Sequence, residues 1–312
     1  MEQALNYAKE LLNENPQITP EEMVHRLHLS GYGVEKSLYA VNSILKPEVD
    51  KLCEIAIKEY KQPLVKREVV KAALSACGFS AKIIETVVSE KYPQDTSRYS
   101  VVFRNDFASL RTEFASAYNI GNGDFTAEAW VCMEYGAFGT IISRKPTAGC
   151  FGNGGFLLVL QPDTSIKFAT DDGFGFYEVV SAPTGVLDKK FHHIMAVRRD
   201  DDLEIYFDFE KLDVRARTNR FPKLNIDNYL GISVGSVEQI QEPFNHFRGL
   251  IGECRLWNKA VTYSSKEEWA NTDYIMPGLI GMWGFWNQSG EDYSDVSNNL
   301  DVSMCRFERW EL

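Results

Sequence analysis

Residues 191–212 of this 312-residue chain contain the pattern that most restricts its fold. Phe191–Arg198 and Leu203–Phe209 are rich in β-branched and aromatic residues interleaved with polar ones, a composition typical of strands. Asp200–Asp202 lie between them, and Asp favours turns because its carboxylate bonds nearby backbone N–H groups. The segment therefore predicts a β-hairpin.

Three further blocks accompany this hairpin. Gly123–Val131 (GDFTAEAWV) precedes it, and Gly249–Asn271 and Leu279–Met304 follow it. In this order the blocks resemble the laminin-G-like domains of the concanavalin A-like jelly rolls. That family has an FT-EAWV strand, an HH hairpin, a G-x-I-x-E-x-R-x-W strand with a short helix, and a last strand followed by an Asp-Ser-Asn turn. The resemblance covers about Tyr99 to Leu312 and implies a jelly-roll sandwich there.

The N-terminal part contains an internal repeat with an offset of 47 residues, which aligns Gly31-Tyr32 with Gly78-Phe79. The other aligned apolar pairs are Leu5 with Leu52, Ile18 with Val65, Met23 with Val70, Leu27 with Leu74, and Val41 with Val88. The helical spacing of these residues predicts three helices in each repeat. The predicted fold is thus multidomain, with all-α tandem three-helix repeats before an all-β jelly-roll sandwich.

Local signals place the helix ends in the first repeat. Pro16 cannot continue the opening helix, and Thr19-Pro20 supplies an N-cap followed by Pro at the first helical position. Gly31 is expected to end the second helix in the left-handed conformation, with Tyr32 packed between helices. The expected domains are repeat 1 (1–46), repeat 2 (47–92), a linker (93–98) and the jelly roll (99–312).

The two repeats also resemble short helical repeats of bacterial surface lipoproteins and phage superinfection-exclusion proteins. Gly31-Tyr32 with Tyr39–Val41, and Gly78-Phe79 with Thr86–Val88, carry this likeness. The lipobox of those proteins is absent. A role in docking or assembly is expected for this module.

Charge restricts the partners. The chain has a net charge of −11, and residues 1–95 contain 12 Lys or Arg and 14 Asp or Glu. Glu21–Ile44 has the helix-turn-helix order, but DNA-binding domains present a basic face, so no nucleic acid partner is expected. No apolar run approaches the roughly 18 residues that span a bilayer, and no membrane insertion is expected.

Six scattered cysteines without C-x-x-C spacing indicate neither a zinc site nor a redox pair. The chain starts with a polar amphipathic segment rather than a signal peptide. A cytoplasmic location with reduced thiols is therefore expected, and non-classical export is the alternative.

Two glycine-rich loops form the candidate ligand site, Gly149–Phe156 and Thr170–Glu178. Glycine permits close approach of a backbone to a ligand, carboxylate and amide groups accept or donate hydrogen bonds, and aromatic faces stack on sugars. The candidate binding residues are Asn153, Asp171, Asp172, Phe174, Phe176 and Tyr177.

No cofactor is expected, and calcium is the one ion that the resemblance leaves open. Pentraxin-type relatives bind calcium in a loop that corresponds to Ser236–Phe247 here, where Glu238, Gln239 and Glu242 only loosely match the acidic pattern. His192 and His193 are adjacent on a strand, so they point to opposite faces and cannot chelate together.

Some jelly rolls of this superfamily are glycoside hydrolases, whose catalytic strand the acidic residues Glu204, Asp208 and Glu210 superficially resemble. Along a strand Glu204 and Glu210 would lie about 20 Å apart, whereas paired glycosidase carboxylates lie about 5 to 9 Å apart. The predicted function is a non-enzymatic recognition protein that binds a glycan through rim loops, with the helical module and homo-oligomer formation providing avidity. The alternatives are an intracellular protein-interaction module without sugar binding and, third, a hydrolase.

Overall fold

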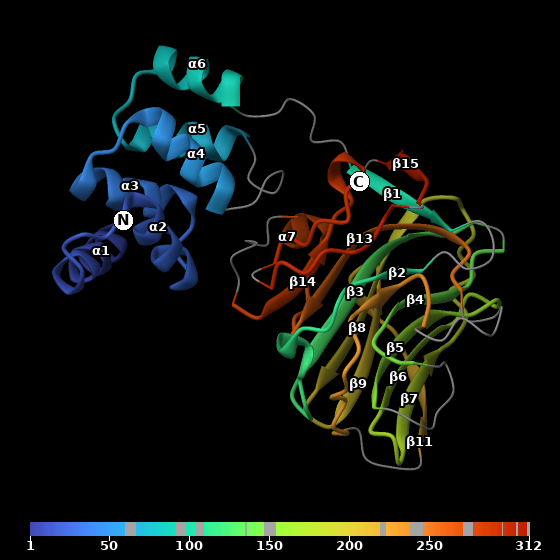
Figure 1. Ribbon diagram of the computed structural model, residues 1–312. Helices are drawn as coiled ribbons and strands as arrows, with labels where there is room; N and C mark the ends of the chain where they lie inside the picture. The colour runs from blue at the N-terminus through green and yellow to red at the C-terminus, as the bar shows by residue number, and fades with distance from the viewer. Residues whose placement is uncertain are drawn as a thin grey trace. The chain divides into compact units, whose positions relative to one another are not determined.

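The computed structural model describes residues 1–59, 67–91, 98–103, 109–134, 136–146, 154–218, 223–237, 246–270, 277–294, 296–303 and 305–310 (Figure 1). It divides into two compact units, one with helices α1–α6 and one with all strands and α7 (Lys266–Ala270). Of the expected linker, only Arg98 lies inside the described residues, where it begins strand β1.

The helical unit contains two successive sets of three helices. The helices are α1 (Glu2–Glu14), α2 (Pro20–Leu29), α3 (Val34–Leu45), α4 (Val49–Glu59), α5 (Arg67–Ala76) and α6 (Ala81–Lys91). The Thr19 hydroxyl caps α2 by accepting the N–H of Glu22. Gly31 and Gly78 have φ values of +83° and +90°, the left-handed conformation that ends a helix without steric cost only for glycine.

Equivalent positions of the two helix sets form one apolar core. The aligned pairs Met23 and Val70, Leu27 and Leu74, and Val41 and Val88 are all fully buried. Tyr32 and Phe79 pack against this core from the edge, while Val65, the partner of Ile18, lies outside the described residues. Among the helices of the described segments, none has both the length and the apolar character needed to cross a bilayer.

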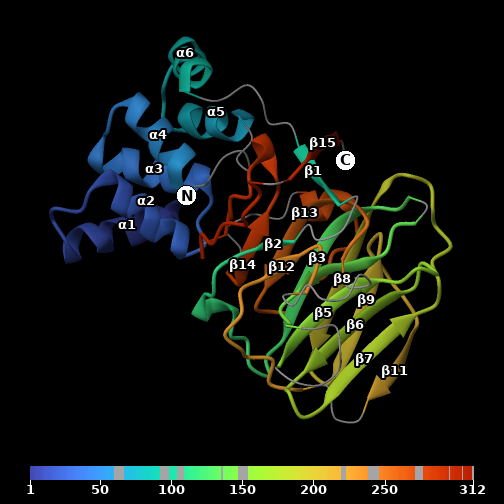
Figure 2. The ribbon, with the colours of Figure 1, turned by 45° about the vertical axis from the view of Figure 1, so that its right-hand side comes forward.

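The second unit is a sandwich of two antiparallel sheets (Figure 2). Sheet A has the order β10-β9-β8-β3-β13-β1-β15, with β14 paired to β13, and sheet B has the order β11-β7-β6-β5-β4-β12-β2. Both parts of the predicted fold class, helical repeats and all-β sandwich, are confirmed. The strands of sheet A are β1 (Arg98–Phe103), β3 (Phe125–Cys132), β8 (Phe191–Arg199), β9 (Asp202–Phe207), β10 (Glu210–Lys211), β13 (Gly249–Trp257), β14 (Leu279–Trp283) and β15 (Phe307–Trp310). Those of sheet B are β2 (Leu110–Arg111), β4 (Gly139–Ser143), β5 (Gly155–Leu160), β6 (Ile166–Asp171), β7 (Phe176–Ser181), β11 (Val214–Thr218) and β12 (Ser233–Val234).

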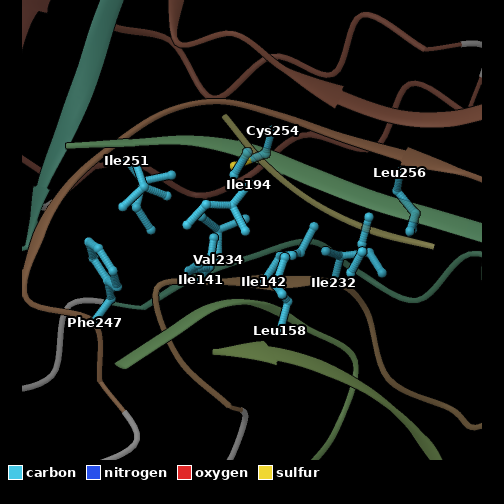
Figure 3. Close-up of a cluster of buried hydrophobic side chains, with 14 of the residues drawn as sticks. Ile141, Ile142, Leu158, Ile194, Ile232, Val234, Phe247, Ile251, Cys254 and Leu256 are labelled. Atoms are coloured by element: carbon cyan, nitrogen blue, oxygen red, sulfur yellow. The ribbon is translucent and has the colours of Figure 1, made fainter. Parts of the chain in front are cut away.

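The period-2 alternation of the strands builds the core between the sheets. In β8, Ile194 points into this core, whereas His193 is buried on the opposite face of sheet A. Figure 3 shows side chains of both sheets converging, among them Ile194 and Ile251 from sheet A and Ile142 from sheet B. The hairpin expected at 191–212 is confirmed as β8 and β9, joined at Asp200–Asp201. The five cysteines of the described segments are all free.

Candidate functional site

The described part of the first predicted ligand loop, residues 154–156, lies at the same end of sheet B as the second loop. Gly155 of β5 pairs with Asp171 of β6, so the end of the first loop adjoins the start of the second. Asn153 lies outside the described residues. Gly155 has φ +148°, and a side-chain carbon there would lie 1.9 Å from the carbonyl oxygen of Arg144. Glycine at this position therefore lets the start of β5 lie close to the backbone that follows the neighbouring strand β4.

The two neighbouring aspartates of the second loop make contacts within the protein. Asp171 is buried, and its Oδ2 lies 2.7 Å from Nζ of Lys145, which is buried as well. Its other oxygen accepts the N–H of Gly173. Asp172 accepts the N–H groups of Phe174 and Gly175 and so closes the turn between β6 and β7. Both carboxylates hold the loop in shape, and Asp172 is the more accessible of the two.

The three aromatic residues of the same loop point to different places. Phe174 is 80% exposed at the turn. Tyr177 packs against the core between the sheets, whereas Phe176, one position earlier in β7, faces the outside of sheet B and lines a groove there. Strand alternation separates the two adjacent rings.

This groove, the sheet B groove, has a volume of about 880 Å³. It follows β7 from Phe176 to Pro183 and is bordered by β6 and β11. The volume lies within the roughly 300–1,000 Å³ of small-molecule sites. Its polar lining consists of Gln161, Asp163, Ser165, Lys167, Glu178, Ser181, Asp213, Arg215 and Arg217.

The charged groups of the sheet B groove balance, since three of the described lining residues are acidic and three are basic. Glu178 is buried in its floor, with Oε1 3.3 Å from Arg217 and Oε2 4.0 Å from Lys167. Arg217 is 75% exposed and can reorient toward a ligand. The groove thus offers a half-buried ring and several hydrogen-bonding groups without a strong net field.

Apart from Phe176, the residues that line the groove were not among the predicted binding residues, and neither was a pair of exposed rings. The rings of Phe114 and Tyr229 lie 6.4 Å apart, and Tyr229 is 91% exposed. The loop with Tyr229 is held by Asn228, whose Nδ2 donates to the carbonyl groups of Arg144 and Gly154. The sequence signal for the groove was the alternation of Phe176, Glu178 and Val180, which places these side chains on one face of β7. No local sequence pattern predicts the pair of Phe114 and Tyr229, because these residues are far apart in the chain.

Glu204 and Asp208, two of the acidic residues that resemble a glycosidase catalytic strand, form contacts within the protein. Glu204 lies 2.5 Å from Nζ of Lys211 and accepts the hydroxyl of Tyr206. Burial alone would raise the pKa of Glu204, but the hydrogen bonds from Lys211 and Tyr206 outweigh it and lower the pKa. Asp208 contacts His192 and accepts the N–H of His193 in the β9–β10 turn. A general acid needs a raised pKa, so Glu204 is unsuited to that role.

The two histidines of strand β8 occupy separate positions, as strand alternation predicts. His193 is fully buried, while His192 lies between Asp188 and Asp208 at 3.0 and 2.6 Å. His25 and His28 both contact Oε1 of Glu59. Within the described ranges no cluster of three or more His, Cys, Asp or Glu suits a metal ion. Residues 238–245, which include Glu238, Gln239 and Glu242 of the calcium loop, lie outside those ranges.

Comparison with known proteins agrees with this architecture. A family model described as the concanavalin A-like lectin/glucanases superfamily matches residues 108–265. Comparison with curated proteins finds no match. A solved structure of a candidate carbohydrate-binding protein from Bacteroides ovatus ATCC 8483 is 15% identical, with a TM-score of 0.49, and covers 70% of this chain and 61% of that one. This chain thus spans about three fifths of that protein.

Two other solved structures are similar in part. The CBM40 of a Ruminococcus gnavus IT-sialidase, bound to α2,3-sialyllactose, is 11% identical with a TM-score of 0.39, covering 51% of this chain and 91% of that one. Domains LG4-5 of the mouse laminin alpha1 chain are 16% identical with a TM-score of 0.39, covering 54% and 44%.

Proposed function

Because the chain belongs to the concanavalin A-like lectin/glucanases superfamily, we propose that its sandwich is a non-enzymatic carbohydrate-binding module that holds a neutral glycan in the sheet B groove. The observation that carries this proposal is the position of Phe176 beside Glu178, Lys167 and Arg217 in one groove of about 880 Å³. A sugar ring would lie on the half-buried ring of Phe176, and its hydroxyl groups would bond the charged side chains.

The predicted rim residues would contribute to this site directly or indirectly. Phe174 and Asp172 belong to the turn that leads into Phe176, so they would contact the part of a glycan that extends past the end of the groove. Asp171 and Tyr177 would act indirectly, since one supports the turn through Lys145 and the other packs on the core. Asn153 remains a predicted ligand contact.

Binding in such an open groove would be weak for one site, and several linked copies would raise the avidity. We assign docking or assembly to the helical unit on this ground, and calcium remains an optional ligand to be tested. A cytoplasmic location likewise stays a prediction. The exposed pair Phe114 and Tyr229 favours the second candidate, a protein-binding module, because adjacent exposed rings are common at protein interfaces.

A glycan array with the full chain tests the proposal, once with calcium and once with chelator. Phe176→Ala should abolish selective binding, whereas Phe114→Ala, which also removes a partly exposed ring of the same unit, should leave it intact. Thermal unfolding of both variants checks that they fold. Absence of binding to every glycan by the folded wild-type chain, or loss of binding only in Phe114→Ala, would refute the groove assignment.

A further inference from the structure

A second pocket of about 450 Å³ lies on the outer face of sheet A, which is the face opposite the inter-sheet core. We call it the basic pocket. Its lining residues come from β3, β15, α7, the start of β8 and the segment just before β8. Its described lining residues are Trp130, Lys189, Lys190, Phe191, Lys266, Arg309 and Trp310.

The lining of this pocket has one sign of charge. Four of the described lining residues are cationic and none is acidic, in contrast to the balanced sheet B groove. Lys190 lies 3.8 Å from Asp188, an acid that also contacts His192. Within the described part of the chain, Lys189, Lys266 and Arg309 form no ion pair, so their charges are available to a ligand.

Acidic residues nearby limit the size of that ligand. Burial, together with Glu134, Asp188 and Glu308, raises the pKa of the Cys132 thiol to about 11, and Cys132 pairs with Phe191 in the sheet. Acidic side chains therefore lie close to the cationic lining, in a chain of net charge −11. A long polyanion would meet repulsion around the pocket, whereas a compact anion that contacts only its lining would not.

The apolar part of the lining suits a ring. Phe191 is half-buried, and its ring lies 4.5 Å from that of Trp310. Trp130 is nine-tenths buried or more, and its indole N–H has no hydrogen-bond acceptor within the described residues. Such unpaired buried donors are uncommon.

We propose that the basic pocket binds an acidic sugar of a short saccharide. The apolar side of the sugar ring would lie against Phe191, and its oxyanion would lie between Lys266 and Arg309. The guanidinium group can bond a carboxylate or a sulfate through two N–H groups, so both kinds of sugar share the chemistry that the pocket recognises. This site is separate from the sheet B groove and uses none of its residues.

Titration of the full chain by calorimetry tests this inference. The probes are trigalacturonate, its methyl ester, which has the same rings without charge, a sulfated galactose trisaccharide, and inorganic phosphate. The variants are Lys266→Gln and Arg309→Gln, with Lys223→Gln as a control that removes one exposed lysine elsewhere in the same unit. Phe176→Ala separates the two sites.

We expect trigalacturonate or the sulfated trisaccharide to bind, the stronger of the two identifying the oxyanion, and the methyl ester to bind at least about tenfold more weakly. Each pocket variant should weaken binding about tenfold or more, as loss of a charge-assisted hydrogen bond does, while Lys223→Gln and Phe176→Ala leave it unchanged. Equal binding of the methyl ester, or unchanged binding in both pocket variants, would overturn the proposal. Competition by inorganic phosphate at the saccharide's own concentration would overturn recognition of the sugar.

Discussion

Oε2 of Glu128 lies 2.7 Å from Nε2 of His193, and both side chains are buried on the outer face of sheet A. The same carboxylate accepts the indole N–H groups of Trp257 and Trp269 and the hydroxyl of Tyr263. Glu128 thereby links three separate parts of the sheet A surface, namely β3 and β8, β13, and the segment that contains α7.

Replacement of this carboxylate should destabilise the sandwich. The Gln side chain has a single acceptor oxygen beside an NH2 group that can only donate, so in Glu128→Gln at least one buried donor loses its acceptor. We expect a loss of about 3–5 kcal/mol in the free energy of unfolding. Urea denaturation measures it. Glu210→Gln, at an exposed position of the same sheet, is the control and should change stability by less than about 0.5 kcal/mol. Similar values for the two variants would contradict the linking role of Glu128.

The same group should make stability sensitive to acid. Burial alone would raise the pKa of Glu128. The hydrogen bonds with His193 and the other donors lower the pKa by a larger amount, so the pKa in the folded protein is below the ordinary value. Its contribution is therefore complete above the pKa of the unfolded chain, about 4.3, and is lost as the pH falls through the folded pKa. Denaturation at pH values from about 6 down to 3 should show stability falling more steeply in the wild type than in Glu128→Gln.

His192 should give the opposite pH dependence. Burial lowers its pKa, but hydrogen bonds with Asp208 and Asp188 outweigh burial and raise the pKa. The resulting stability is present below the unfolded pKa of about 6.5 and disappears as the pH rises through the raised folded pKa. The stability difference between wild type and His192→Gln should therefore be larger at about pH 6 than at about pH 9. An equal difference at both values would show that packing of the ring on Phe207, rather than charge, is responsible.

Sequence patterns predicted the fold better than the site, for a physical reason. Strand periodicity and turn residues are local, so the hairpin at 191–212 and the helix end at Gly31 could be found from neighbouring residues. The resemblance of four ordered blocks then indicated the sandwich. Alternation also correctly placed His192 and His193 on opposite faces.

In β7 alternation separates Phe176 from Tyr177, so the two predicted binding residues face opposite sides of sheet B. Other site features depend on contacts that no local pattern reveals. Lys145, which follows β4, pairs with Asp171 of β6 across the intervening strand β5. Arg309 and Lys266, far apart in the chain, line the same pocket. Side chains that meet only through tertiary packing need a structure to be found.

The buried pair of Lys145 and Asp171 supports the turn that leads to Phe176. Removing one partner leaves an uncompensated buried charge, so Lys145→Met should cost about 3–5 kcal/mol of stability. Replacing both residues by apolar ones of similar size, as in Lys145→Met with Asp171→Leu, should recover most of that loss in urea denaturation. A double variant as unstable as the single one would mean that the hydrogen bond from Gly173 to Asp171 contributes more than the ion pair.

Gly31 and Gly78 end the second helix of each repeat with φ values of +83° and +90°. A side-chain carbon at either glycine would meet no atom within 4 Å, so any effect of alanine arises from the backbone conformation. Gly31→Ala and Gly78→Ala should each lower the free energy of unfolding by about 1 kcal/mol. Gly33→Ala is the matched control, because it also has open space around it but lies at φ −72°, and it should cost clearly less. Equal losses at Gly31 and Gly33 in urea denaturation would mean that the left-handed turn does not limit the choice of residue, and that equivalent glycines in the repeats have another cause.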